Sequence, residues 1–145
     1  MAVATTDLSA VWEAFFRTTR RLRARASAFP GGLTLAQYHL LQPLRTAREL
    51  TVGELAESAG VAAPTATRML DSLARDERIV RRHSDTDRRS VLVSLTPAGR
   101  RALDAAHEET EAFRRRVFER LEPEEREQAA LMLTRLNEVL EEQLR

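Results

Sequence analysis

Arginines in the middle of the chain have the spacing needed to contact a polyanion. Arg68 and Arg75 are seven positions apart, so in a helix they lie on one side, two turns from each other. Guanidinium groups can form paired hydrogen bonds with guanine O6 and N7, and Thr can contact base edges or phosphate. Hydroxyl-bearing residues and a helix-starting proline lie close to these two arginines. The candidate reading residues, which would contact the bases or phosphates of DNA, are Pro64, Thr65, Thr67, Arg68, Ser72 and Arg75. The alternative is a solvated helix face on which Arg68 pairs with Asp71 or Ser72.

A second group of charges, Asp87, Arg88 and Arg89, falls in a polar loop between two β-branched segments. Those segments, residues 78–83 and 91–95, predict a hairpin of two short strands. An exposed Arg at such a tip can enter a narrow A·T-rich minor groove, where the negative potential is highest. Asp87 is placed to hold that guanidinium in a preset pose. The alternative is a local Asp–Arg pair on a solvated loop, which contributes little.

The helix that carries Arg68 must bury its opposite side. Ala66, Met69, Leu70 and Leu73 recur at i, i+3, i+4 and i+7, so a helix from Pro64 to Arg75 packs that side on a core. Before it, the capping box Thr51-Val52-Gly53-Glu54 starts a short helix that Gly60 ends. Two helices joined by a glycine turn, with small Ala residues where they cross, predict a helix-turn-helix.

Four further helices are expected on either side of this module. They cover residues 7–28, a helix from the capping box at 34–37, residues 97 to about 120, and a last helix opened by Pro123. Their apolar stripes can be buried within one chain or against a second copy. The aromatic cluster of Trp12, Phe15 and Phe16 favours a homodimer over a monomer.

Composition bounds the class of protein. A chain of 145 residues is expected to be one domain, 1–145, with a DNA-binding lobe at about 34–99 and dimerisation helices at about 7–28 and 97–145. Residues 68–101 hold nine Arg against five acids, whereas residues 102–145 hold seven Arg against twelve acids. A basic middle segment beside an acidic tail is typical of nucleic-acid-binding proteins, and the net charge of +1 for the whole chain does not reveal it.

The lack of Cys excludes disulfides and thiol sensing. With no export signal or membrane span, we expect a cytoplasmic protein.

Two segments resemble the MarR family of bacterial transcriptional regulators: residues 63–71 (APTATRMLD) and 87–96 (DRRSVLVSLT). The Asp-x-Arg loop that runs into a Val-x-Leu-Thr strand is the family's most recognisable pattern, and the likeness covers nearly the whole chain. The resemblance implies a winged helix-turn-helix fold, mainly α with a small β-hairpin wing, in dimers with interlocking terminal helices. It places Pro64, Thr65, Thr67 and Arg68 on a major-groove recognition helix. It places Asp87 and Arg89 in the wing motif, with Arg88 between them.

This chain departs from the family at both ends of the recognition helix. Many relatives have Gly just after it, where this chain has Arg78 following Asp76 and Glu77. A non-Gly residue in a left-handed cap carries strain of about 1 kcal/mol or more, so we expect a different turn. At the other end, Ala62 and Ala63 offer no side-chain cap, which leaves the first N–H groups for DNA phosphate or water.

Regulators resembling this chain usually bind a small molecule, or sense oxidation, between dimer helices and DNA-binding lobes. A candidate site for an aromatic or lipophilic ligand lies near Trp12, Phe16, Tyr38 and His39, with Arg17 or Arg20 available for an anionic group. The alternative is that these aromatic residues are core or dimer contacts.

Two other classes of protein compete with a DNA-binding regulator. An enzyme is disfavoured because the three His residues have no metal-ligand spacing and there is no glycine-rich phosphate loop or nucleophile motif. We therefore expect no metal and no cofactor. A helical dimer that binds only another protein would present a neutral or acidic face, whereas this face carries Arg68, Arg75, Arg82, Arg88 and Arg89. By resemblance, repression of transcription is the expected outcome of DNA binding.

Overall fold

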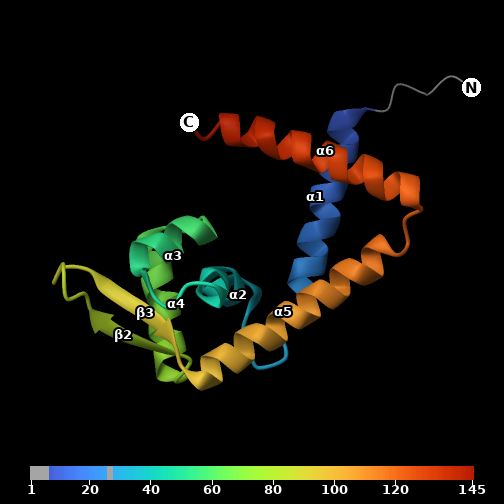
Figure 1. Ribbon diagram of the computed structural model, residues 1–145. Helices are drawn as coiled ribbons and strands as arrows, with labels where there is room; N and C mark the ends of the chain where they lie inside the picture. Colours follow the sequence, from blue (N-terminus) through green and yellow to red (C-terminus); the bar gives the residue numbers. More distant parts are fainter. Residues whose placement is uncertain (1–6, 26–27) are drawn as a thin grey trace, which may run out of the picture. The chain divides into compact units, whose positions relative to one another are not determined.

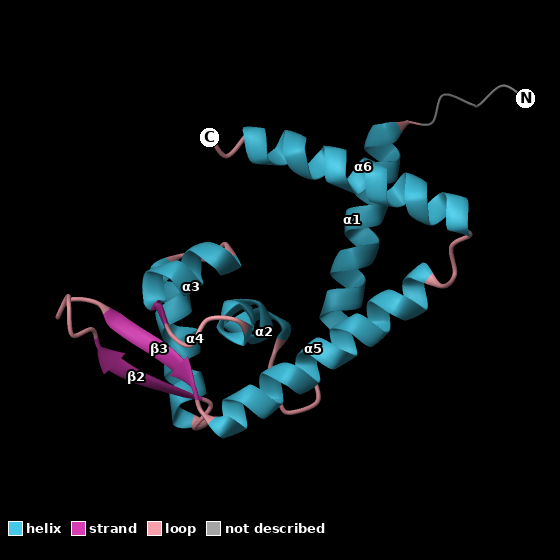
Figure 2. Ribbon diagram, viewed as in Figure 1, coloured by secondary structure: helices cyan, strands magenta, loops and turns pink. Residues whose placement is uncertain are grey.

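The computed structural model describes residues 7–25 and 28–145, most of which are helical (Figures 1 and 2). The elements follow in this order: α1 (Leu8–Arg25), α2 (Leu35–Leu41), the 3-10 turn η1 (Gln42–Arg45), β1 (Leu50–Thr51), α3 (Val52–Ala59), α4 (Ala63–Arg75), β2 (Ile79–His83), β3 (Val91–Leu95), α5 (Pro97–Phe118) and α6 (Pro123–Glu142). The predicted fold class, mainly α with a small β component, is confirmed. None of the described helices is both long enough and apolar enough to cross a membrane.

The chain forms two compact units, one ending at His107 and one starting at Glu108, so α5 begins in the first and ends in the second. The first predicted helix ends at Arg25, and residues 26 and 27 of its expected span lie outside the described residues. The long helix ends at Phe118, close to the predicted residue 120, and α6 begins at Pro123 as expected.

Both predicted capping boxes start their helices. The Thr34 hydroxyl accepts a hydrogen bond from the Gln37 N–H (3.1 Å), and the Gln37 side chain accepts one from the Thr34 N–H (3.0 Å). At α3, the Thr51 hydroxyl accepts from the Glu54 N–H (3.2 Å), and the Glu54 carboxylate accepts from the Thr51 N–H (2.7 Å). That backbone hydrogen bond, with one from the Thr51 hydroxyl, lowers the pKa of Glu54. Local hydrogen bonds therefore set where α2 and α3 begin.

The helix-turn-helix consists of α3 and α4, joined through Gly60. Gly60 is left-handed, with φ 63°, and its N–H donates to the carbonyls of α3. This backbone conformation is accessible to glycine at little cost, which explains its place at the end of α3. Both helices bury one side in a common core with α2, the sheet and the start of α5; the members include Leu41, Leu55, Ala66, Leu70, Leu73, Val93 and Leu103.

The sheet has three antiparallel strands in the order β1-β3-β2. The hairpin β2–β3 was predicted from the sequence, but β1 was not. Only Leu50 and Thr51 form β1, pairing with Val93 and Leu92, and two residues are too few to show the alternation that marks a strand. Figure 1 shows the hairpin extending away from α2, with its loop at the far end. Strand β1 therefore joins the middle of β3 to the start of α3.

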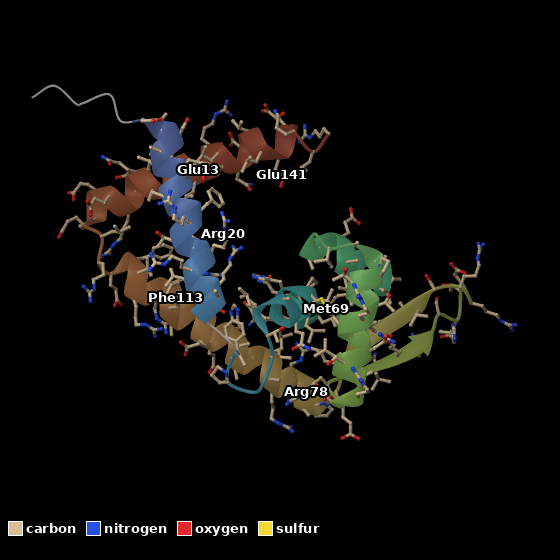
Figure 3. The ribbon with its side chains drawn as sticks, turned by 180° about the vertical axis from the view of Figure 1, so that it is seen from behind. Glu13, Arg20, Met69, Arg78, Phe113 and Glu141 are labelled. Carbon is tan, nitrogen blue, oxygen red and sulfur yellow. The ribbon has the colours of Figure 1, made fainter. Side chains whose placement is uncertain are left out.

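The turn after α4 contains a non-glycine residue in the left-handed region. Glu77 is the left-handed residue, with φ 54°, and the Arg78 N–H donates to the Leu73 carbonyl at 2.8 Å. The strained position is therefore Glu77, one residue before the expected one. Arg78, labelled in Figure 3 at the end of α4, instead donates from its guanidinium to the Ala98 carbonyl at 3.2 Å.

The start of α5 packs closely against this turn. The Thr96 hydroxyl donates to the Glu77 carbonyl (2.7 Å) and accepts from the Gly99 N–H (2.9 Å). Gly99 is buried, and a Cβ added to it would lie 1.8 Å from the Arg78 carbonyl oxygen. Only a residue without a side chain allows α5 to begin so close to the turn that joins α4 to the wing.

Candidate nucleic-acid interface

Helix α4 has one buried side and one exposed side, as the periodicity predicted. Ala66, Leu70 and Leu73 are fully buried. Met69 is partly buried and packs against the core on the side of α4 that faces α2 (Figure 3). Of the candidate reading residues, Pro64, Thr67, Arg68 and Arg75 are exposed, whereas Thr65 and Ser72 are half-buried. The helix therefore presents two guanidinium groups to solvent, with hydroxyl groups and Pro64 around its first turns.

The start of α4 has no side-chain cap, because the N-cap residue is Ala62. The N–H groups of Thr65 and Ala66 both donate to the Ala62 carbonyl, at 2.9 and 3.0 Å, and Pro64 has no N–H. Fewer donors are thus left for a phosphate than the sequence suggested. In the described part of this first turn, the Ala63 N–H is the donor without a backbone acceptor.

The wing loop is shaped by short side chains that bind its own backbone. The Ser84 hydroxyl accepts from the N–H groups of Thr86 and Asp87, each at 3.3 Å. The Asp87 carboxylate accepts from the Arg89 N–H at 3.0 Å, while its distance to the Arg89 Nε is 3.8 Å. Asp87 therefore holds the turn more closely than it holds the guanidinium. The side chain of Arg89 is 96% exposed, so it is free to reach a groove of DNA.

Arg81, which the sequence pattern did not single out, links the wing to α4. One of its terminal nitrogens lies 2.6 Å from the Asp71 carboxylate, and the other donates to the Thr67 carbonyl at 3.2 Å. The pairing of Arg68 with Asp71 that was considered from the sequence is therefore not formed. Within the described residues, Arg68 has no ion pair and remains available to a partner. A contact between residues ten positions apart in different elements leaves no local signal in the sequence.

Arg82, the next residue of β2, makes a separate set of contacts. Its guanidinium lies 2.6 and 3.1 Å from the two carboxylate oxygens of Glu49, just before β1, and 3.2 Å from Asp85. The hydrogen bond with Glu49 raises the pKa of Arg82. Arg82 thus ties the far strand of the hairpin to the segment that leads into β1.

A groove of about 410 Å³ joins the helix-turn-helix to the wing. Its lining comes from the end of β1, the start of α3, the exposed side of α4, and the strands and loop of the wing: Thr51, Val52, Gly53, Thr67, Arg81, Arg89, Ser90 and Val91. The groove brings Thr67 and Arg89, two of the predicted DNA contacts, to one surface. A chemical group that enters it meets hydroxyl groups and two guanidinium groups, which suits an anion such as a phosphate.

The four residues considered for a ligand fall into two pairs. Trp12 and Phe16 lie on α1 with their ring centroids 4.6 Å apart, and both are partly exposed. Tyr38 is fully buried in the core, with its hydroxyl 3.2 Å from the Nδ1 of His107, whereas His39 beside it is exposed. Tyr38 is a core residue, whereas Trp12, Phe16 and His39 have exposed surface that a ligand can contact. Among the described residues, no group of three or more His, Asp or Glu side chains is arranged to hold a metal ion.

A helix-turn-helix with an exposed basic helix, followed by an arginine-bearing β-hairpin, defines a winged helix-turn-helix DNA-binding protein. A sequence model of the MarR family matches residues 33–91. The repressor MdtR of Bacillus subtilis is 35% identical over 114 residues, covering 76% of this chain and 71% of its own. The chain belongs to the MarR family, and it is a helix-turn-helix transcriptional regulator that binds DNA.

Solved structures show the same fold. A point mutant of Escherichia coli MarR, in complex with operator DNA, is 25% identical, with a TM-score of 0.72, over 90% of this chain and 94% of the other. BpsR of Bordetella bronchiseptica, whose DNA binding is regulated by 6-hydroxynicotinic acid, is also 25% identical, with a TM-score of 0.72, over 88% of this chain and 98% of its own.

Proposed function

We propose that this chain is a sequence-specific repressor. It binds a pseudo-palindromic operator as a homodimer in the cytoplasm, and a small ligand releases it. The observation that carries this proposal is the groove that places α4 and the wing on one surface, with Arg68 and Arg89 both exposed. One element suits the major groove and the other the minor groove. MdtR, to which the chain is similar, is a repressor, and a compact dimer on a promoter blocks polymerase without further parts.

Binding to the gene's own upstream region tests the proposal. Fluorescence anisotropy would compare that duplex with a scrambled duplex at two salt concentrations. We expect tight, salt-sensitive binding that prefers the native duplex by about a thousandfold or more. A transcription assay with purified polymerase would then show less transcript when the protein is present. Equal weak binding to both duplexes, or a rise in transcript, would contradict a sequence-specific repressor.

The homodimer is supported by exposed apolar side chains in two parts of the chain. On α1, Val11 is 52% exposed and Phe15 is 56% exposed. In the unit from Glu108 onward, α6 buries none of its residues, and Leu131 is 68% exposed. Apolar surface on this scale is typical of helices that bury it against a partner. Sedimentation equilibrium should give twice the chain mass of 16.4 kDa; a monomer at micromolar concentration would contradict the proposal.

The ligand is proposed to be a small aromatic or lipophilic compound, with an anionic group that Arg17 or Arg20 can bind. BpsR, a protein of the same fold, responds to an aromatic acid, and α1 of this chain presents the Trp12–Phe16 pair beside these arginines. To release DNA, the ligand must bind the DNA-incompetent state of the protein more tightly than the DNA-competent state. A tenfold change in the ratio of the two states needs about 1.4 kcal/mol of difference between the two binding free energies. Phenolic acids at millimolar concentration should raise the melting temperature and weaken operator binding. No change in either would count against this ligand class.

Replacing Arg89 with Ala should weaken binding most at operators with A·T-rich flanks. A guanidinium in the minor groove gains from the narrow groove of such flanks, and that gain disappears with the side chain. Anisotropy titrations on operators with A·T and G·C flanks measure the difference. Arg101→Ala, which removes the same charge from an exposed position outside the wing and α4, is the control. An equal loss on both flanks would indicate a phosphate contact instead.

A further inference from the structure

Arg81 connects the wing to the recognition helix through two contacts on the same helix. Its guanidinium lies 2.6 Å from the Asp71 carboxylate and donates to the Thr67 carbonyl at 3.2 Å. The Arg81 Nε is buried, and within the described residues it has no hydrogen-bond partner. The side chain of Arg81 is 28% exposed, whereas that of Asp71 is 52% exposed. Among the described residues, both contacts of the guanidinium are thus made with α4, in the lining of the groove between α4 and the wing.

The pairing of the strands explains why Arg81 makes these contacts and Arg82 does not. Arg81 lies opposite the buried Val93, and Ile79, two residues earlier, is also buried. Neighbouring side chains of a strand point to opposite faces, so Arg81 extends toward α4 while Arg82 extends toward Glu49. Two adjacent arginines with equal charge therefore have different partners, and they allow charge and position to be tested separately.

We propose that Arg81 is a positioning residue that sets the spacing between α4 and the wing, so that Arg68 and Arg89 engage their two grooves together. The proposal rests on the proposed function. Strand β1 and Arg82 attach the hairpin to the segment before α3, whereas Arg81 attaches it to α4. Without Arg81 the wing can shift relative to α4, and a reading group displaced from its site loses its hydrogen bonds to the base edges. Arg81 also neutralises Asp71, a carboxylate on the exposed part of α4 that would otherwise repel phosphate.

The first test compares Arg81→Met with Arg82→Met, each of which removes one positive charge from β2. Titrations with the native and the scrambled duplex give two dissociation constants for each variant. Arg81→Met should reduce the preference for the native duplex by about tenfold, as does the loss of a base contact. Arg82→Met should weaken binding to both duplexes alike and preserve the preference to within about threefold. Equal changes in preference for the two variants would overturn the proposal.

Arg81→Lys keeps the charge but replaces the fork of donors with a single ammonium group, which cannot reach both acceptors in the same way. We expect Arg81→Lys to prefer the native duplex over the scrambled duplex less than the wild type does and more than Arg81→Met does. A full recovery would show that charge alone matters and would also overturn the proposal. Circular dichroism and melting curves check that each variant is folded, which we expect because a partly exposed ion pair contributes little to stability.

A second test needs no DNA. The chain has no Cys, so cysteines introduced at Glu57 on α3 and Thr86 at the wing tip can be spin-labelled specifically. Excess unlabelled chain would restrict the measured distances to one protomer. The distribution of distances between the two spin labels should be narrow in the wild type and broad in Arg81→Met and in Asp71→Ala. The double variant should be no broader than Arg81→Met alone, because Asp71→Ala removes one of the two contacts that Arg81→Met already removes.

Unchanged widths would overturn the proposal whatever the DNA results show. If the wild type shows no preference for the native duplex, the proposed function fails, while the distance measurement still decides whether Arg81 positions the wing.

Discussion

Replacing Gly99 with Ala should destabilise the protein by about 3 kcal/mol, near the upper end of what overpacking usually costs. The added methyl group would lie 1.8 Å from the Arg78 carbonyl oxygen, and that atom belongs to the backbone. The same carbonyl accepts the Thr96 N–H at 3.0 Å, so moving it disturbs the turn that positions the wing. For a chain of this size, we expect the melting temperature to fall by about 6–12 °C.

Gly53→Ala is the matched control for this experiment. Gly53 lies exposed in the first turn of α3, and its added Cβ would approach the Thr51 hydroxyl no closer than 3.9 Å. Since Ala is favoured over Gly in a helix by about 0.5–1 kcal/mol, this variant should be as stable as the wild type or slightly more so. Thermal melts of the Gly99→Ala and Gly53→Ala variants and the wild type, all at one protein concentration, give the melting temperatures to compare. A Gly99→Ala protein that melts with the wild type would show that α5 can move away from the turn.

Replacing Arg68 with Ala should weaken binding to the native operator by about 1–3 kcal/mol and relax the preference at one base pair in each half-site. Arg68 lies on the exposed side of α4, and Asp71, its nearest potential acidic partner on the helix, is bound to Arg81. The guanidinium is therefore available for a base edge without first breaking an ion pair. Binding measured on operators with each base pair changed in turn would locate the lost contact.

Arg101→Ala is again the comparison, because it removes an exposed charge from α5. It should lower the affinity for all duplexes slightly and leave the base preferences intact. If Arg68→Ala binds every operator as the wild type does, Arg68 does not belong to the reading face. If Arg68→Ala lowers the affinity for all operators equally, Arg68 contacts phosphate and another residue of α4 contacts the bases.

Features that depend on neighbours a few residues apart could be predicted from the amino-acid sequence. Both capping boxes form as predicted because the groups that bond are three residues apart, and Gly60 ends α3 because the backbone there must be left-handed. The buried and exposed sides of α4 follow from helical periodicity, and the β2–β3 hairpin follows from its two β-branched segments. The exposed Arg68 and Arg89 could therefore be found without coordinates.

Contacts between residues far apart in the chain required the folded structure. Strand β1 exists because Leu50 and Thr51 reach β3, about forty residues later, and two residues carry no pattern of their own. The left-handed strain falls on Glu77, not Arg78, because the Arg78 N–H binds the Leu73 carbonyl. Asp71 takes Arg81 as its partner because the register of β2 turns that side chain toward α4. Such contacts depend on how whole elements pack, and packing is set by the complete core and not by any one segment.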